Sequence, residues 1–541
     1  MLSPEYLDQA GEKVASVYRQ IEADMLAYLA RRMVEGGIAD QRSLTALELL
    51  AQSSASALME IIGRHEADIS RAVRLEVTDA IKRCSADDLR RIRQGLGVDL
   101  EAATTRQAAL TIGGVARILE RDNIDMAEGA RRAFLDASTW AVTQVNSGAM
   151  TTERALHMAV RRLERDGVSV VQYRNAATGA QTVANKVDVA VRRHIRTQIL
   201  QDGMTMTEGI MDQAGVQLVE VSSHGGSRPS HAKWEGRVYS RHGDQVIDGV
   251  LYRDFKTACN WGDVADGIGG ANCRHSYSAW FPGMKRLYEP DPPHPSGMDN
   301  AEVYELTQKQ RAGEREIRAT KRELAGAQMM YEKSKSEKDL GEVLQLKLRL
   351  RDQQARMRQL VGENPKVLQR SPRREWAGDM PKVTLTVSAQ TKKRALDAAN
   401  LKDECAKKRR PIYDDGPLGA VAGAAYRKID KTKGYPVVCH GAPDFVEVLG
   451  KKTDHKLLAD VIRQRDDYEE GAPVLLLSCS TGKDPRRGPC FAQRLADELG
   501  VPVTAPNGIL QVFSNGKLEV GDQPGHNTGG FITFEPRKGK R

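Results

Sequence analysis

The chain has 541 residues, of which 40% are hydrophobic and 28% are charged, and its formal net charge is +9. This length exceeds what a single hydrophobic core fills, so we expect three or four domains of ordinary globular composition. The positive surplus is mild, and acidic residues are interleaved with the basic ones nearly everywhere. The charge therefore permits contact with nucleic acid but does not demand it.

The number of cysteines and the N-terminal residues indicate in which cellular compartment the chain folds. The seven cysteines are few and irregularly spaced, which argues against a secreted disulfide framework and for a reducing environment. Charged residues from Glu5 to Lys13 break up any apolar start, so we expect no signal peptide. No uninterrupted apolar run approaches the ~20 residues that a membrane span needs.

The first 165 residues show the apolar spacing of amphipathic helices. Tyr18, Ile21 and Leu29 fall on one helical face. Stretches such as His65–Lys82 and Met126–Val145 repeat the pattern. We expect a helical packing module without chemistry of its own.

After residue 165 the spacing of apolar residues changes from that of helices to that of strands. Val168–Tyr173 and Gln181–Val183 are strand-like around a turn at Asn175–Gly179, which predicts a hairpin. A helix is expected over Asp188–Asp212, and a strand over Gln217–Val221.

A charged segment and a linker follow. Residues 299–362 are rich in Lys, Arg and Glu, with a partial apolar stripe between Leu340 and Met357. This pattern predicts a helical hairpin or a coiled-coil arm. Residues 363–381 contain Pro365, Pro372 and several arginines, which indicates a linker.

From Lys382 onward the pattern is α/β. Continuous apolar runs at Pro436–Cys439 and Val474–Leu477 are typical of buried parallel strands. Helices are expected over Lys392–Lys407, His455–Arg465 and Cys490–Leu499, and further strands over Val383–Val387, Val501–Ala505, Ile509–Phe513 and Phe531–Phe534, before a basic tail at Lys538–Arg541.

These patterns predict a multidomain α+β protein. Its parts are a helical N-terminal region (1–165), a small α+β central domain (166–298), a charged helical arm (299–362), a linker (363–381) and a C-terminal α/β domain (382–541).

The central domain contains the densest group of His, Cys, Trp and Gly residues. His224 and His231 precede the pair Cys273 and His275, which are separated by one residue. Three imidazoles and one thiolate supply the nitrogen and sulfur ligands that tetrahedral zinc prefers, so these four residues are the predicted metal ligands. The Cys-x-His bite is tight, and neither pair has the usual zinc-finger spacing.

The alternative for this group involves no metal. The two histidines of the glycine-rich turns would then be hydrogen-bonding hubs, and Cys273 would be a small buried hydrophobe. Arg228 and Arg274 would make structural bonds to main-chain carbonyls. The sequence leaves both interpretations open.

Three runs in this region resemble a known family. His224–Gly236, Gly267–His275 and Phe281–Gly283 are similar to the phage minor capsid protein family of tailed phages. That family is in turn similar to Mu-type head morphogenesis proteins, which share a His…His…Gly…Asn-Cys-Arg-Cys/His layout. The charged run Tyr304–Arg318 resembles the family's C-terminal part, and the resemblance extends over residues 1–370.

The resemblance implies a structural protein of the virion head that is associated with the portal, and it does not imply an enzyme. Portal and capsid proteins are then the expected partners, with phage DNA as a further candidate and no membrane. The expected location is the phage head, with the host cytoplasm as the place of assembly. No resident cofactor is expected, apart from zinc at the predicted ligands.

A second candidate site lies in the C-terminal domain. His440-Gly441 and Ser478-Cys479 each follow an apolar run, at the carboxyl ends of strands where α/β sheets place catalytic groups. A Cys nucleophile needs a nearby base, and His supplies it. Gly441 and the amides around Cys479 could bind an oxyanion.

The layout of apolar strand–His–Gly and apolar strand–Ser–Cys resembles the caspase-like cysteine peptidases, over residues 382–536. By this resemblance, His440 is the base and Cys479 the nucleophile. Cys439 directly before the histidine departs from the pattern, as does the short segment between Gly441 and the second strand. The alternative is two ordinary buried strands that end in a His and a Cys.

Two hypotheses of different class follow. In the first, the chain is a minor capsid protein at the portal that carries an extra C-terminal domain. In the second, it is a cysteine peptidase or toxin effector that is delivered with the phage particle. A nucleic-acid-binding protein is a third hypothesis, which rests on the mild positive charge alone.

Overall fold

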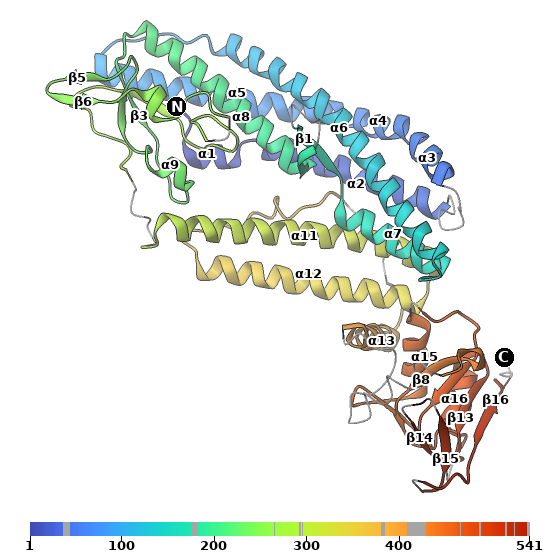
Figure 1. Ribbon diagram of the computed structural model, residues 1–541. Helices are drawn as coiled ribbons and strands as arrows, with labels where there is room; N and C mark the ends of the chain where they lie inside the picture. Colours follow the sequence, from blue (N-terminus) through green and yellow to red (C-terminus); the bar gives the residue numbers. More distant parts are fainter. Residues whose placement is uncertain are drawn as a thin grey trace. The chain divides into compact units, whose positions relative to one another are not determined.

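A computed structural model of the chain (Figure 1) forms two compact units, each of which is described by itself. Unit 1 comprises Met1–Trp140, Ala159–Gly326 and Leu350–Pro381, and unit 2 comprises Ala141–Met158, Ala327–Arg349 and Lys382–Arg541. The predicted domain boundaries stay predictions. The structure describes residues 1–35, 44–174, 181–264, 266–290, 294, 296–379, 385–407, 429–465, 467–485, 488–513, 515, 517–523 and 525–537.

The N-terminal region is helical, as predicted. In α2 the side chains of Tyr18, Ile21 and Leu29 are fully buried, and this helix packs against α5 and α8. The predicted apolar stripe is therefore the face that enters the core. The helices of this region are α1 (Pro4–Gln9), α2 (Glu12–Glu35), α3 (Leu44–Gln52), α4 (Ala55–Arg64), α5 (Glu66–Leu96), α6 (Thr104–Asn146) and α7 (Thr152–Asp166), and the helix predicted over Asp188–Asp212 is α8 (Val187–Gln213).

Two hairpins and a small sheet complete the α+β part of unit 1. The predicted hairpin is β1 (Ser169–Arg174) with β2 (Gln181–Lys186); its turn at Asn175–Gly179 lies outside the described residues. A three-stranded antiparallel sheet has β3 at its centre, between β4 and β7. The other elements are β3 (Leu218–Val221), α9 (Pro229–Ala232), β4 (Val238–Ser240), β5 (Gln245–Ile247), β6 (Val250–Tyr252), α10 (Phe255–Ala258) and β7 (Tyr277–Trp280).

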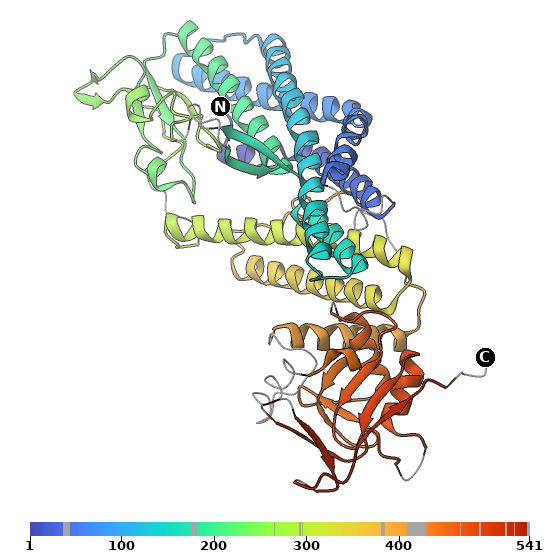
Figure 2. The ribbon, with the colours of Figure 1, turned by 45° about the vertical axis from the view of Figure 1, so that its right-hand side comes forward.

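The charged segment consists of two helices, α11 (Asn300–Ser334) and α12 (Glu337–Glu363), which run side by side (Figures 1 and 2). Many charges of α11 are buried in unit 1. Arg318 pairs with Asp188 of α8 at 3.2 Å, and Arg322 pairs with Glu22 of α2 at 3.5 Å. The hydrophilic sequence of this helix therefore reflects buried ion pairs as well as solvent exposure.

Apart from Glu363, the last residue of α12, the described part of the predicted linker contains no helix or strand, yet it packs on other parts of unit 1. Arg374 forms an ion pair with Asp8 at 2.8 Å, and Gly378, at φ 97°, lies against Ala23 of α2. Its arginines are thus structural. Among the described helices of the whole chain, none has the length and apolarity that a membrane crossing requires.

Unit 2 contains a four-stranded sheet in the order β16-β13-β12-β8. The strands β8, β12 and β13 are parallel, and β16 is antiparallel to β13. The described elements of the C-terminal domain are α13 (Ala389–Lys407), a short 3-10 helix (Lys431–Lys433), β8 (Tyr435–Val438), β9 (His440–Gly441), β10 (Val446–Val448), β11 (Lys451–Thr453), α15 (His455–Gln464), β12 (Val474–Leu477), α16 (Phe491–Leu499), β13 (Val503–Pro506), β14 (Ile509–Val512), β15 (Leu518–Gly521) and β16 (Phe531–Phe534).

The two faces of this sheet are covered differently. Val474 and Leu476 of β12 belong to a core with apolar residues of α13, α15 and α16. Leu475 and Leu477 belong to a smaller core with Leu510 of the β14–β15 hairpin. This alternation is the period of two expected of a strand. It confirms the predicted α/β character of this domain.

Two other predictions for the C-terminal part of the chain were not confirmed. Of the strand predicted over Val383–Val387, the first two residues lie outside the described chain and the other three are not a strand. Leu385 and Val387 are half-buried and Thr386 is exposed, and local β-propensity alone did not make them a strand. The basic tail at Lys538–Arg541 lies outside the described residues.

A buried carboxyl in α7 gives a pH-dependent prediction. Glu164 is 2% exposed and shares Arg322 with Glu22, and burial raises the pKa of Glu164 from 4.5 to about 8. The folded chain keeps this proton up to about pH 8, whereas the unfolded chain loses it near pH 4.5. The stability that this group contributes is therefore complete below pH 4.5 and is lost as the pH rises to about 8.

Glu164→Gln is expected to remove this part of the pH dependence, because the amide does not titrate. The measurement is urea unfolding between pH 5 and pH 9, followed by tryptophan fluorescence, which reports on unit 1 because all five tryptophans belong to it. Wild-type and variant curves of equal slope against pH would contradict the assignment. Glu153→Gln, an exposed change on the same helix, is the control.

Candidate functional site

The central His/Cys group lies where two neighbouring strands end. His224 follows β3 and His275 precedes β7, and the ladder between these strands continues through Ser222 N–H, which donates to Ser276 O at 2.8 Å. The rings of His224 and His275 are consequently stacked, with centroids 4.5 Å apart. His231 comes from α9, a one-turn helix that begins at Pro229, a residue favoured at a first helical position.

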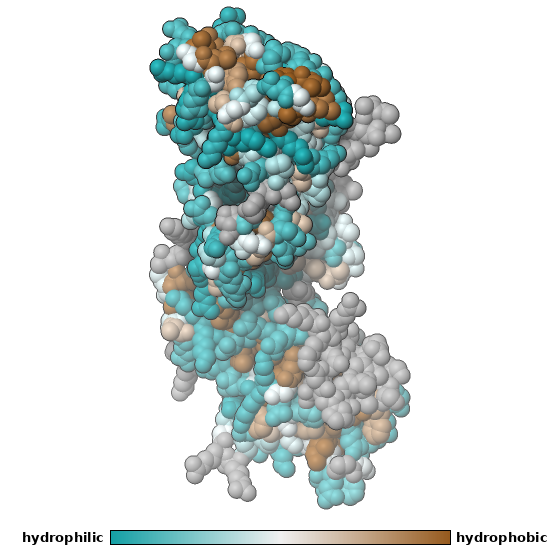
Figure 3. All heavy atoms as spheres, turned by 90° about the vertical axis from the view of Figure 1, so that its left-hand side faces the viewer, coloured by the Kyte–Doolittle hydropathy of each residue, from teal (hydrophilic) through white to brown (hydrophobic). Residues whose placement is uncertain are grey.

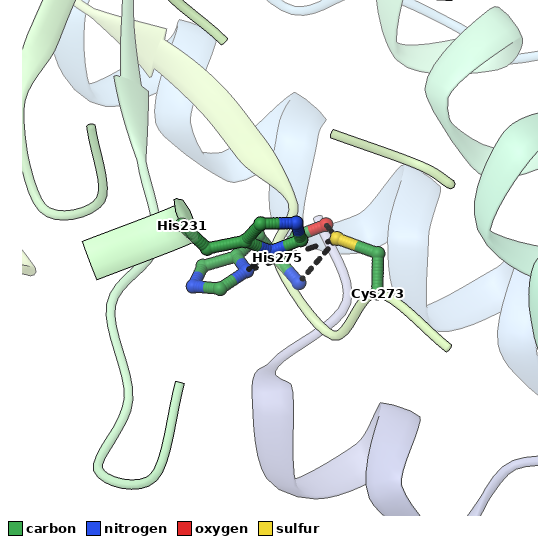
Figure 4. Close-up of side chains that lie close together, drawn as sticks. All are labelled: His231, Cys273 and His275. Atoms are coloured by element: carbon green, nitrogen blue, oxygen red, sulfur yellow. Dashed lines mark hydrogen bonds between the residues drawn. The ribbon is translucent and has the colours of Figure 1, made fainter. Parts of the chain in front are cut away.

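Three of the four predicted ligands converge (Figure 4). His231 Nδ1 lies 3.3 Å from His275 Nδ1, and Cys273 Sγ lies 3.7 Å from the same His275 nitrogen. The three ligand atoms all lie within 4.8 Å of one another, and each of the three side chains is at most 2% exposed.

Carboxylates face the other nitrogens of the two rings. His275 Nε2 is 2.7 Å from Glu235 Oε2, and Glu235 is itself fully buried. His231 Nε2 is buried without a hydrogen-bond partner, and its nearest carboxylate is Asp266 Oδ1 at 3.9 Å. Burial lowers the pKa of His231 to about 4 and the pKa of His275 well below its usual value. Both rings are therefore neutral at pH 7, the form that binds metals.

The fourth predicted ligand, His224, is not part of the converging group. Its Nδ1 donates to Gly225 O at 3.1 Å, and burial lowers its pKa well below the usual value. The arginine part of the metal-free interpretation holds: Arg228 donates to Ala271 O, and Arg274 donates to Gly226 O at 3.3 Å. These bonds fix the turns and are compatible with either interpretation of the cluster.

The C-terminal candidates follow two neighbouring parallel strands. In the parallel ladder Leu477 of β12 pairs with Val438 of β8, so Cys479 and His440 each stand two residues beyond a registered pair. Gly441 lies against the other strand end, since a Cβ there would collide with Ser478 Oγ and come within 3.1 Å of Cys479 O. This contact explains why glycine follows the histidine. Ser480, directly after the cysteine, has a positive φ of 57°.

The main chain of β14 covers the cysteine. Leu510 N–H donates to Cys479 Sγ at 3.4 Å, and Cys479 Sγ lies 3.8 Å from Leu510 O. Cys479 is partly exposed, whereas Cys439 belongs to the helix-covered core. Cys439 is therefore packed in that core, and the alternation along an extended strand places the neighbouring His440 on the opposite face.

Comparison with known proteins decides the family. A family model described as phage minor capsid protein 2 matches residues 2–362, well over half of the chain. The chain belongs to the phage minor capsid protein 2 family. A second model, a domain of unknown function (DUF8616), matches residues 419–520. No curated protein and no solved structure matches the chain.

The family match confirms that this minor capsid protein is a phage structural protein of the virion. The matched residues include the whole His/Cys group. The match over the C-terminal domain names no activity, so the caspase-like assignment of His440, Gly441 and Cys479 stays a hypothesis.

Sequence reasoning missed two residues of the minor capsid protein's central site, Glu235 and Asp266. Glu235 stands four residues after His231 in the turn that follows α9, where its N–H donates to His231 O at 3.2 Å. This spacing of one turn is the signal that could have found it. Asp266 follows α10 in an irregular loop, where spacing carries no comparable information.

Proposed function

We propose that this phage structural protein sits at the portal of the head and that its C-terminal domain is a cysteine peptidase. Membership of the minor capsid family over residues 2–362 carries the first part. Portal and capsid proteins are the partners in this proposal. Phage DNA is a further candidate partner, which the net charge of +9 alone supports.

An exposed apolar hairpin supports a contact with another virion protein. Val246 and Leu251 are register partners of β5 and β6 and are 68% and 51% exposed, and Val250 beside them is 51% exposed. Figure 3 shows apolar side chains at the upper end of the face that carries this hairpin. Contiguous exposed apolar side chains of this kind mark protein–protein contact sites.

The full-length protein is expected to co-purify with assembled heads that contain the portal. The double variant Val246→Asp/Leu251→Asp should lower its incorporation at least tenfold, because charges in an apolar contact are desolvated without partners. The measurement is quantitative mass spectrometry of purified particles. Leu110→Asp, at a 60% exposed position of α6, is the matched control and should keep normal incorporation.

Particles that lack the wild-type protein while it accumulates in the host cytosol would refute the assembly role. Normal incorporation of the hairpin variant would leave the assembly role intact and exclude the hairpin as the contact.

The second part of the proposal rests on the register of two strands. Leu477 and Val438 are paired, and the residues two positions beyond them are the Cys and the His that acyl-transfer chemistry requires. In this mechanism His440 takes the proton of Cys479, and the sulfur attacks a peptide carbonyl. The peptide C–N bond breaks as His440 gives that proton to the leaving amine, and water then hydrolyses the thioester. Its protein substrate would be met in the host, if the domain is delivered as an effector, or within the head.

A further inference from the structure

We propose that the central domain holds one zinc ion on His231 Nδ1, Cys273 Sγ and His275 Nδ1, with Glu235 and Asp266 as the carboxylate partners of the two imidazoles. This site is independent of portal binding and of peptidase activity. It differs from the set predicted from spacing, because His224 is outside it.

The distances between the ligand atoms fit one ion. Zinc bonds of about 2.0–2.1 Å to nitrogen and about 2.3 Å to sulfur, at tetrahedral angles, place two nitrogens about 3.3 Å apart and a nitrogen and a sulfur about 3.6 Å apart. The observed separations are 3.3 Å between the two Nδ1 atoms and 3.7 Å between His275 Nδ1 and Cys273 Sγ. The third pair, His231 Nδ1 and Cys273 Sγ, lies within 4.8 Å, and a common ion would hold these two atoms about 3.6 Å apart.

The tautomers of the His231 and His275 rings also favour a bound ion. His275 Nε2 lies 2.7 Å from Glu235 Oε2, and when it donates its proton to that carboxylate, Nδ1 keeps a lone pair. Without an ion, either His231 Nδ1–H or the Cys273 thiol would donate to that lone pair, and His231 Nε2 would stay buried without a hydrogen-bond partner. With an ion, both Nδ1 lone pairs coordinate it.

The same ion gives the remaining nitrogen a partner. In the metal-bound tautomer His231 Nε2 carries the proton and faces Asp266 Oδ1, which is 3.9 Å away and requires only a small side-chain movement. Each ligating imidazole then has a carboxylate on its other nitrogen, the arrangement that orients histidine ligands and raises their basicity.

The ligand chemistry selects the metal class. One thiolate and two neutral imidazoles suit zinc and exclude Mg²⁺ and Ca²⁺, which prefer oxygen ligands. Burial raises the pKa of the Cys273 thiol, and a bound cation reverses this by taking the thiolate and releasing the proton. The site would join α9 to the loop before β7, and its three protein ligands leave the fourth tetrahedral position of the ion to a water molecule.

Full-length protein purified without chelator and equilibrated with zinc is expected to contain about one zinc per chain by elemental analysis. Equilibrated with Co²⁺ instead, it should show a thiolate-to-cobalt charge-transfer band in the near ultraviolet. Cys273→Ser should lose the band, and Cys259→Ser should keep it. Cys259→Ser is the matched control for Cys273→Ser, because Cys259 is also a buried cysteine of the same domain but lies outside the ligand group.

Two further variants sharpen the test. Glu235→Gln should weaken zinc affinity by about 10–100-fold, as loss of a carboxylate behind a ligating histidine does, and His224→Ala should keep the metal. The proposal is overturned if wild-type protein neither retains zinc nor develops the cobalt band, or if Cys273→Ser keeps that band. Should Cys273→Ser fail to fold, the wild-type cobalt spectrum and the Glu235→Gln affinity decide.

Discussion

Cys479→Ala is expected to abolish the proposed peptidase or toxic activity while leaving the fold of the C-terminal domain intact. Cys479 is partly exposed at a strand end, so loss of its sulfur opens little cavity. The loss of activity should be complete, because the covalent intermediate cannot form without the nucleophile. His440→Ala should lower turnover by about 10²–10⁴-fold, the contribution of a positioned general base.

A thiol-alkylating probe at neutral pH, with mass-spectrometric peptide mapping, tests the nucleophile before any substrate is known. All seven cysteines are described, and Cys479 is the one that is not buried, so it should react first. Exposure alone would give the same order, and therefore the decisive result is slower labelling of Cys479 in His440→Ala. His526→Ala, which removes a 61% exposed histidine of the same domain, is the control.

Faster labelling of Cys439, or full activity in Cys479→Ala, would show that the caspase-like assignment is wrong. Unchanged labelling in His440→Ala would separate the two residues and favour a binding module with two ordinary strand ends.

The sequence was sufficient for elements with a strong period. The apolar stripe of α2 and the continuous apolar runs of β8 and β12 come directly from local composition, so their existence and type were predicted. The parallel pairing of β8 and β12 followed from the same composition, because strands buried on both faces are typical of parallel sheets. That pairing brings His440 and Cys479 to one edge.

Short elements were missed. The β5–β6 hairpin has strands of three residues each, too short for a period to emerge. Its turn is Asp248-Gly249, both at positive φ, 50° and 78°, and an Asp-Gly pair is a strong local hairpin signal. Turn chemistry would therefore have located this hairpin where hydrophobic alternation did not.

In the central site, the spacing of residues along the chain does not predict which side chains form the cluster. Separations along the chain nominated four ligands, but the choice among them depends on tertiary contacts. His224 is held by Gly225 O, whereas His275 is oriented by Glu235, a residue 40 positions away. The partner of a buried imidazole is set by how the sheet and loops close, and this information is not local.

Glu220→Ala is expected to destabilise unit 1 by about 3–5 kcal/mol, the cost of removing one partner of a buried ion pair. Glu220 lies in β3 and is fully buried. Its Oε2 accepts from Arg91 of α5 at 2.8 Å, and its Oε1 accepts from the N–H groups of Leu287 and Tyr288 at 2.7 and 3.0 Å. Alanine leaves a buried guanidinium and two main-chain donors without this acceptor.

Urea unfolding followed by tryptophan fluorescence measures this effect, because the five tryptophans all belong to unit 1. Asp87→Ala breaks an exposed pair with Arg90 on the same helix α5 and should change the midpoint little. Adding Arg91→Met to Glu220→Ala should recover part of the loss, since the buried unpaired guanidinium is then gone. The two main-chain donors and the more exposed Arg286 still lack Glu220 Oε1. A Glu220→Ala midpoint equal to that of the wild type would show that β3 is not anchored to α5 through this pair.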